Sequence, residues 1–162
     1  MNQKVRLKVN GTDHELDIPA RRLLVDCIRY DIGLTGTKES CSVGVGGACA
    51  VLVDGEMYAS CITLAASVDG AEITTIEGIA EDGNLHPIQQ AFIDHGGFQC
   101  GICTPGQIIA TKSLLDENPS PTEDEIKDYM MGNLCSCTGY YGILNSIAAA
   151  AKNMNEAAES GG

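Results

Sequence analysis

Seven of the eight cysteines in this chain of 162 residues fall into two groups, and this pattern constrains the chain more than any other feature. Eight cysteines are about 5% of the residues, below the roughly 8–10% typical of a small disulfide scaffold. The N-terminal residues alternate charged and apolar side chains and lack the apolar run that a secretory signal needs. We therefore expect a cytoplasmic, reducing location, where cysteines bind metal or carry out redox chemistry rather than form disulfides.

The second group combines Cys100-x-x-Cys103 with Cys135-x-Cys137, in loops rich in glycine and threonine at the starts of predicted helices. Helix dipoles and backbone amides stabilise thiolates there, and two such loops can bring four thiolates together. A structural zinc site also uses four thiolates. The Cys-x-Cys spacing is cramped for zinc, and the neighbouring amides and hydroxyls suit bridging sulfides, which favours an iron–sulfur cluster.

The first group consists of Cys41, Cys49 and Cys61, on and just after a glycine-rich loop. Plant-type [2Fe–2S] ferredoxins use the spacing Cys-x4-Cys-x2-Cys with a distant fourth cysteine. The spacing from Cys41 to Cys49 fits this pattern and Cys61 takes the distant place, but Gly46 stands at the second position. The glycine content is typical of a loop that folds tightly round a cluster.

Hydrophobic periodicity divides the chain near residue 78. Before it, alternating residues and two Asx-Gly turns predict two hairpins, an intervening helix and a last strand, which is an α+β unit. The predicted strands are 4–9, 16–18, 50–53, 57–60 and 72–76, and the predicted helical stretches are 23–28 and 62–66. After it, apolar residues recur at helical spacing. The predicted helices are 88–92, 105–115, 123–131, with a capping box from Thr122 to Glu125, and 141–151.

Specific motifs surround both groups of cysteines. The first half carries Gly36-Thr37-Lys38, Gly47-Ala48-Cys49, Val53-Asp54-Gly55 and Ser60-Cys61. The second half carries Gln99-Cys-Gly-Ile-Cys-Thr-Pro-Gly106, Asn118-Pro-Ser-Pro-Thr122 and Gly132-Asn-Leu-Cys-Ser-Cys-Thr-Gly-Tyr140. With these motifs, about residues 4–150 resemble the small iron–sulfur subunit of the molybdenum hydroxylases, the family of xanthine dehydrogenases, aldehyde oxidoreductases and carbon monoxide dehydrogenases.

The resemblance implies a β-grasp, plant-type ferredoxin-like domain at residues 1–78 and an all-α four-helix domain at residues 79–162. It implies two [2Fe–2S] clusters. The inner cluster, near the molybdopterin, would be held by Cys100, Cys103, Cys135 and Cys137. The outer cluster, facing a flavin, would be held by Cys41, Cys49 and Cys61. Gln99 occupies the position of a family glutamine close to the pterin.

The resemblance also implies a role and partners. The chain would bind no substrate and would carry single electrons between a molybdenum centre and FAD. A large subunit would hold the molybdopterin and a medium subunit the FAD, in a dimer of heterotrimers.

Two positions depart from the family pattern. Gly46 offers no ligand where the family has cysteine, so the outer cluster is three-coordinate, takes another ligand or is absent. Ser42 could supply an oxygen, whereas Cys27 lies on an apolar helical face and is predicted to be a core residue. Ser136 stands where the family usually has arginine, and the missing positive charge should disfavour the reduced inner cluster.

Composition excludes other classes and leaves some open. The formal net charge of −12 argues against nucleic-acid binding, which needs basic patches. No apolar run approaches the roughly 18 residues needed to cross a bilayer. A freestanding ferredoxin-like carrier is the main alternative, although a simple ferredoxin would not need the helical second half. A zinc-stabilised interaction module would be colourless, and the substrate of the complex is not encoded in this chain.

Overall fold

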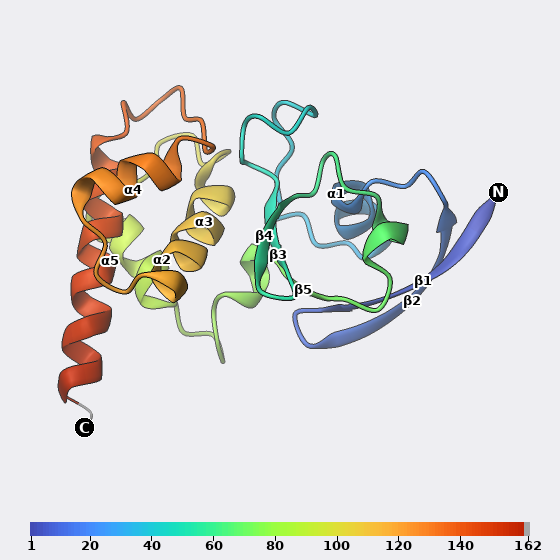
Figure 1. The fold of residues 1–162 in the computed structure, drawn as a ribbon, viewed down its shortest axis with the longest axis horizontal. Helices are drawn as coiled ribbons and strands as arrows, with labels where there is room; N and C mark the ends of the chain where they lie inside the picture. The colour runs from blue at the N-terminus through green and yellow to red at the C-terminus, as the bar shows by residue number, and fades with distance from the viewer. Residues whose placement is uncertain (161–162) are drawn as a thin grey trace.

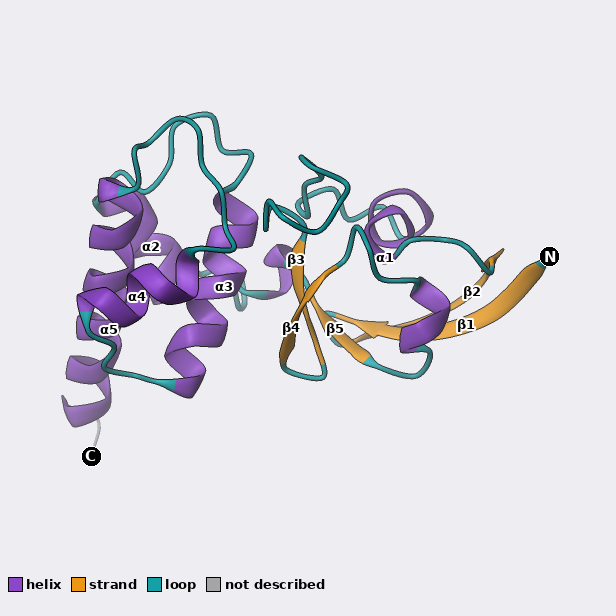
Figure 2. Ribbon diagram, turned by 45° about the horizontal axis from the view of Figure 1, so that its top comes forward, coloured by secondary structure: helices purple, strands orange, loops and turns teal. Residues whose placement is uncertain are grey.

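A computed structural model describes residues 1–160, and Gly161 and Gly162 at the end of the predicted helical half lie outside it. The described residues form a mixed α/β structure in which the strands come first and the long helices follow (Figure 1). Figure 2 shows the longer helices gathered at one end of the molecule and the twisted sheet, with short helical segments beside it, at the other.

The sheet has five strands in the order β2-β1-β5-β3-β4. Their bounds are β1 Asn2–Val9, β2 Thr12–Pro19, β3 Ala50–Val53, β4 Glu56–Ala59 and β5 Glu72–Thr74. Both predicted hairpins are confirmed, β1 with β2 and β3 with β4. Their turns need positive φ angles, which Asn10, Gly11, Asp54 and Gly55 adopt, as expected for type I′ hairpins. The last strand, β5, lies between the hairpins, parallel to β1 and antiparallel to β3.

The first helix is shorter and more irregular than the predicted stretch 23–28. A single α-helical turn, α1 (Leu24–Asp26), continues into a wide π-helical turn at Cys27–Asp31. Cys27 is fully buried there, and this burial raises the pKa of its thiol to about 11, which confirms it as a core residue. The stretch 62–66 is not an α-helix, because only a short 3₁₀ turn forms, at Ala65–Val68.

Four α-helices follow the sheet, and each predicted helix has its counterpart. They are α2 Pro87–Asp94, α3 Thr104–Glu117, α4 Glu123–Met130 and α5 Tyr141–Ser160. The predicted capping box is confirmed at α4, and a second box joins His86 and Gln89 at α2. The last helix runs nine residues beyond the predicted end at 151, because no glycine or proline occurs at positions 152–160 to stop it.

The strand β3 joins two hydrophobic cores. Ala50 and Leu52 pack against the helices, whereas Val51 and Val53 pack into the core formed by the other strands and α1. Side chains alternate between the faces of a strand, so a strand buried on both faces lies between two layers. The helical half is therefore packed directly against the sheet. No helix among residues 1–160 is long and apolar enough to cross a membrane.

Candidate metal centre: two groups of cysteines

The second group of cysteines forms two sulfur pairs, and each pair joins the two loops. Cys100 and Cys103 precede α3, with Cys103 at its N-cap, while Cys135 and Cys137 lie between α4 and α5. The Sγ atoms of Cys137 and Cys100 are 3.3 Å apart. The second pair is a hydrogen bond between Cys103 and Cys135. The structure thus brings together all four cysteines predicted for the inner site.

Within each pair, one thiol is prepared to be a thiolate. The amide of Ile102 and the thiol of Cys137 hydrogen-bond to Cys100 and lower its pKa. Burial opposes ionisation of Cys135, but the Thr138 hydroxyl, 3.2 Å from its sulfur, and nearby amides lower its pKa to about 7. The buried thiol of Cys103 has its pKa raised to about 12 by desolvation. A buried thiol of this kind loses its proton when it binds a metal.

The arrangement in pairs bears on the two kinds of metal site left open by the sequence. Among residues 1–160, no three metal-ligating side chains are arranged to hold a single ion. A structural zinc site would need all four thiolates around one centre. Two pairs, each with one cysteine from either loop, instead match two irons with two thiolates each, so the residues present fit a [2Fe–2S] cluster.

The first group is built in the same way but is incomplete. Cys49 and Cys61 are buried side by side as free thiols, with Cys61 hydrogen-bonded to Cys49 and its pKa raised to about 11 by burial. Cys41 lies on the loop, where amides from Val43 to Gly46 donate to its sulfur and lower its pKa to about 7. Cys41 is therefore the member of the group that lacks a second thiol.

Position 46, where the resemblance leads us to expect a cysteine, lies next to Cys41. A Cβ atom added to the buried Gly46 would lie 3.3 Å from the Sγ of Cys41. The same Cβ would lie 3.0 Å from the hydroxyl of Ser40, which the sequence analysis did not single out, although it directly precedes Cys41. Ser42, the predicted oxygen donor, is exposed, adopts a φ of 56° and is not among the three atoms nearest to this position. Three thiols alone do not complete a [2Fe–2S] ligand set.

Hydrogen bonds connect the two groups of cysteines. The amide of Leu134, next to Cys135, donates to the carbonyl of Gly46 at 3.0 Å. The side-chain amide of Asn133 donates to the carbonyl of Gly47 at 3.3 Å, and the main-chain carbonyl of Asn133 accepts from the side chain of Gln107 at 2.9 Å. Figure 1 shows the loops before β3 and between α4 and α5 on the same upper side of the molecule.

Apolar side chains surround the exposed cysteines. Gln99 is exposed beside Cys100, and Phe98, Ile102 and Leu134 on the same loops are 41%, 48% and 53% exposed. Phe98 also lines an apolar groove with residues of α2 and α3. Together these side chains form an exposed apolar surface on the loops that carry the second group of cysteines.

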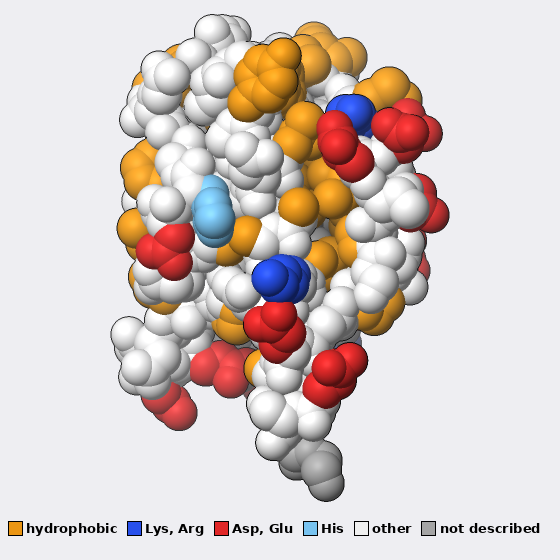
Figure 3. All heavy atoms as spheres, turned by 90° about the vertical axis from the view of Figure 1, so that its left-hand side faces the viewer, with side chains coloured by type: hydrophobic (Ala, Val, Ile, Leu, Met, Phe, Trp, Pro, Cys, Tyr) orange, Lys and Arg blue, Asp and Glu red, His pale blue; other side chains and the backbone are white. Residues whose placement is uncertain are grey.

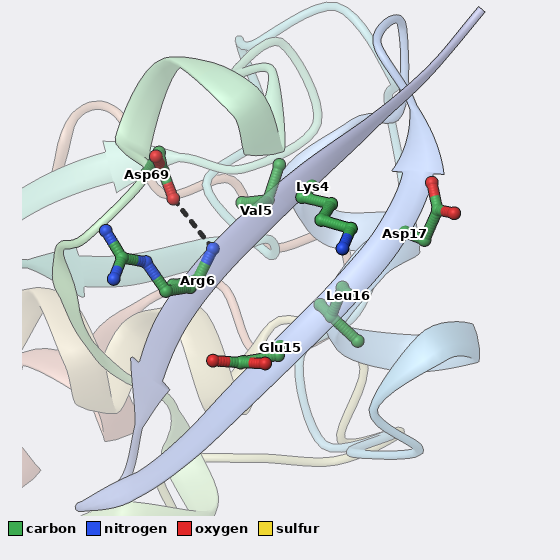
Figure 4. A pocket seen from close by; sticks show the side chains of 7 residues that line it. All are labelled: Lys4, Val5, Arg6, Glu15, Leu16, Asp17 and Asp69. Carbon is green, nitrogen blue, oxygen red and sulfur yellow. Dashed lines mark hydrogen bonds between the residues drawn. The ribbon is translucent and has the colours of Figure 1, made fainter.

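A larger hollow lies away from the cysteines. It is lined by the β1–β2 hairpin and Asp69, whose carboxylate accepts a hydrogen bond from the amide of Arg6 at 2.7 Å (Figure 4). Its charged side chains, Lys4, Arg6, Glu15 and Asp17, are of mixed sign and include no cysteine or histidine.

The fold and the paired thiols define an iron–sulfur protein of the [2Fe–2S] class. A family model described as "[2Fe-2S] binding domain" matches residues 75–148. The chain is 46% identical over 139 residues to the nicotinate dehydrogenase small FeS subunit of Eubacterium barkeri, covering 86% of this chain and 88% of that one. It belongs to the family of small iron–sulfur subunits of the molybdenum hydroxylases.

This chain is similar to one part of a larger relative. The chain is 44% identical to the aldehyde oxidoreductase of Megalodesulfovibrio gigas, covering 96% of this chain but only 17% of that protein. Among solved structures, a chain of quinoline 2-oxidoreductase from Pseudomonas putida 86 superposes with a TM-score of 0.91 at 39% identity, covering 96% of this chain and 97% of that one.

Proposed function

We propose that this chain is the electron-transfer subunit of a heteromeric oxidoreductase that contains molybdopterin and FAD. It relays single electrons between the molybdenum centre and FAD through two [2Fe–2S] clusters. Cys100, Cys103, Cys135 and Cys137 hold the inner cluster, and Cys41, Cys49 and Cys61 belong to the outer one. The observation that carries the proposal is the set of two sulfur pairs, each of which joins the two loops of the inner site. The amide of Leu134 in one of these loops is hydrogen-bonded to the loop of the outer group.

The residues around the inner site stabilise negative sulfur. A [2Fe–2S] cluster supplies one-electron redox chemistry when it is bound. The amide of Ile102 and the hydroxyl of Thr138 donate to two of the sulfurs, and such hydrogen bonds help to set the reduction potential. The hydroxyl of Tyr140 accepts from the amide of Cys135 at 2.8 Å and holds the loop in place.

The contact between the loops supports a relay between the two sites. From Cys135 the covalent chain passes to Leu134, and one hydrogen bond joins Leu134 to Gly46, at the position where the motif places an outer ligand. The close approach is possible because Gly106 and Gly47 have no side chains: a Cβ on Gly106 would fall on the carbonyl oxygen of Gly47.

Two exposed apolar surfaces support the proposal that this chain binds two partner subunits. Around the inner site, Phe98, Ile102 and Leu134 would be covered by the large subunit, with Gln99 directed to the pterin. Around the outer site, Val43, Val45 and Ile62 are 64%, 59% and 59% exposed, and the medium subunit would cover them. Clustered apolar side chains of this kind mark protein interfaces. Hydrophobic side chains also gather in the groove between α4 and α5 (Figure 3), and this groove offers further area for contact with a partner subunit.

The division of the chain follows from the same assignment. We place a β-grasp domain with the outer site at residues 1–78 and a helical domain with the inner site at residues 79–162, in a dimer of heterotrimers. The end of the sheet at Thr74 and the start of the long helices at Pro87 support this boundary. Substrate is bound and turned over on the large subunit.

Purification of a tagged chain from its native host tests the proposal. We expect a large and a medium subunit to co-elute and the complex to absorb visible light. Replacement of Cys137 by alanine should remove the iron of the inner cluster, roughly half of the total, whereas the buried Cys27→Ala control should retain it. A colourless chain that elutes alone would contradict the proposal, and a coloured chain that elutes alone would favour the freestanding carrier.

A further inference from the structure

The incomplete first group raises the question of what completes it. This inference rests on the proposed outer site. Cys49 and Cys61 form one sulfur pair there, by analogy with the two pairs of the inner site. Cys41 therefore needs a partner at the side of the loop occupied by Gly46.

The loop keeps the shape of a metal-binding loop although a cysteine is absent from it. The amides of Val43, Gly44, Val45 and Gly46 all donate to the sulfur of Cys41. This wrapping requires left-handed backbone conformations, which glycine adopts without strain, and φ is 79° at Gly44. The backbone of this loop therefore still wraps round the sulfur of Cys41.

The hydroxyl of Ser40 lies next to the position that a side chain at residue 46 would occupy. The hydroxyl of Ser40 and the sulfur of Cys41 lie 3.0 and 3.3 Å from the Cβ that a residue at position 46 would carry. They are also the nearest heteroatoms to it, and Ser40 itself is exposed to solvent. Ser42 has a left-handed backbone and is not among the nearest atoms.

We propose that the Ser40 hydroxyl is the fourth protein ligand of the outer iron–sulfur site and takes the place of the cysteine missing at Gly46. A bond forms between Oγ and a ferric iron, the O–H bond breaks, and the proton passes to the solvent at the exposed loop; nothing is oxidised or reduced. Ligands are deprotonated when they bind metal, and an oxygen donor is harder than a thiolate. The outer site is then a Cys₃Ser site.

The test compares four variants of the purified complex by iron analysis and low-temperature EPR. In Ser40→Ala we expect the iron to fall from about four atoms per chain to about two, with loss of the outer signal only. Ser42→Ala is the matched control and should keep the iron and both signals of the unmodified complex. Ser40→Cys and Gly46→Cys should each keep about four iron atoms and shift the outer signal towards that of an all-thiolate cluster.

The outcomes separate this inference from the proposed function. If Ser40→Ala retains all iron and an unchanged outer signal, another group is the ligand and the inference is wrong. If the unmodified complex holds about two iron atoms and Gly46→Cys about four, the outer site exists but Ser40 does not complete it. If no variant exceeds about two iron atoms, the outer site itself is refuted together with the inference. Co-elution of the partner subunits shows that each variant is folded.

Discussion

Single thiols within each group differ in their readiness to ionise. Hydrogen bonds lower the pKa values of Cys41 and Cys135 to about 7, whereas burial raises those of Cys61 and Cys103. The first two present thiolates near neutral pH, and the buried two give up their protons to metal. Each group therefore combines an accessible thiolate with a buried thiol that closes the site.

At the same scale, the exposed Ser136 between two inner cysteines allows a test of local charge. Reduction adds negative charge to the cluster, so a nearby cation should favour the reduced form. We expect Ser136→Arg to raise the potential of the inner cluster by tens of millivolts, since an exposed charge pair contributes about 1 kcal/mol. A redox titration followed by EPR measures it, with Ser136→Gln as the uncharged control. No shift, or a fall, would reject the explanation.

At the scale of elements, the helices are defined by their ends. The capping box of α4 has the Thr122 hydroxyl accepting from the amide of Glu125, and the Glu125 carboxylate accepting from the amide of Thr122. Hydrogen bonds from the amide and the hydroxyl of Thr122 to this carboxylate lower the pKa of Glu125. The box was readable in the sequence because both partners lie within one turn of helix.

Removal of this cap should destabilise the helical half. We expect Thr122→Ala to lower the free energy of unfolding by about 1 kcal/mol near neutral pH, measured by urea denaturation. The pKa of Glu125 is lower in the folded protein than in the unfolded chain, so its ionised carboxylate stabilises the folded state. This stabilisation is fully present above the unfolded-state pKa and is lost as the pH falls through the folded-state pKa. The difference in the free energy of unfolding between the variant and the unmodified protein should therefore become smaller in acid.

The neighbouring Glu123 provides the control for this prediction. Its ion pair with Lys127, at 2.6 Å, lies on an exposed surface, so Glu123→Ala should cost less than the cap variant. The cap does not stabilise α4 if both variants lose the same free energy of unfolding, or if the loss in Thr122→Ala becomes larger in acid.

At the scale of the whole molecule, the two halves meet at glycines. A Cβ on Gly106 of α3 would fall on the carbonyl oxygen of Gly47 and lie 2.9 Å from the Cα of Ala48, whereas a Cβ on Gly132 would meet nothing within 4 Å. Backbone atoms cannot rotate away as side chains do, so an added methyl group at Gly106 must separate the halves.

The prediction for this contact uses the two glycines as a pair. We expect Gly106→Ala to lower the stability by about 1–3 kcal/mol, even though alanine favours helix, and to lower the thermal midpoint measurably. Gly132→Ala should change the midpoint little. Similar midpoints for both variants would indicate that the halves are not held by this close approach.

The elements with local signals were predictable. Both hairpins carry turn residues that accept positive φ, and α4 begins at its capping box. The predicted helical stretches differ in the type of turn where packing decides the conformation. The stretch at 23–28 is helical but widens into a π turn at Cys27, and 62–66 gives way to a 3₁₀ turn at Ala65–Val68. Periodicity identifies a buried face but not the type of turn that brings it to the core.

The sequence by itself determined which residues are expected to carry the chemistry, because ligand type and spacing within a loop are local properties, and it predicts that Gly46 interrupts one motif. Only the tertiary structure decided which atoms meet. Cys100 pairs with Cys137 across 37 positions, and Gly106 lies against Gly47 across 59. The Ser40 hydroxyl stands before Gly46 only because the intervening backbone wraps round the Cys41 sulfur. Such meetings depend on how separate segments pack, and the packing free energy is shared by the whole chain rather than encoded at any one position.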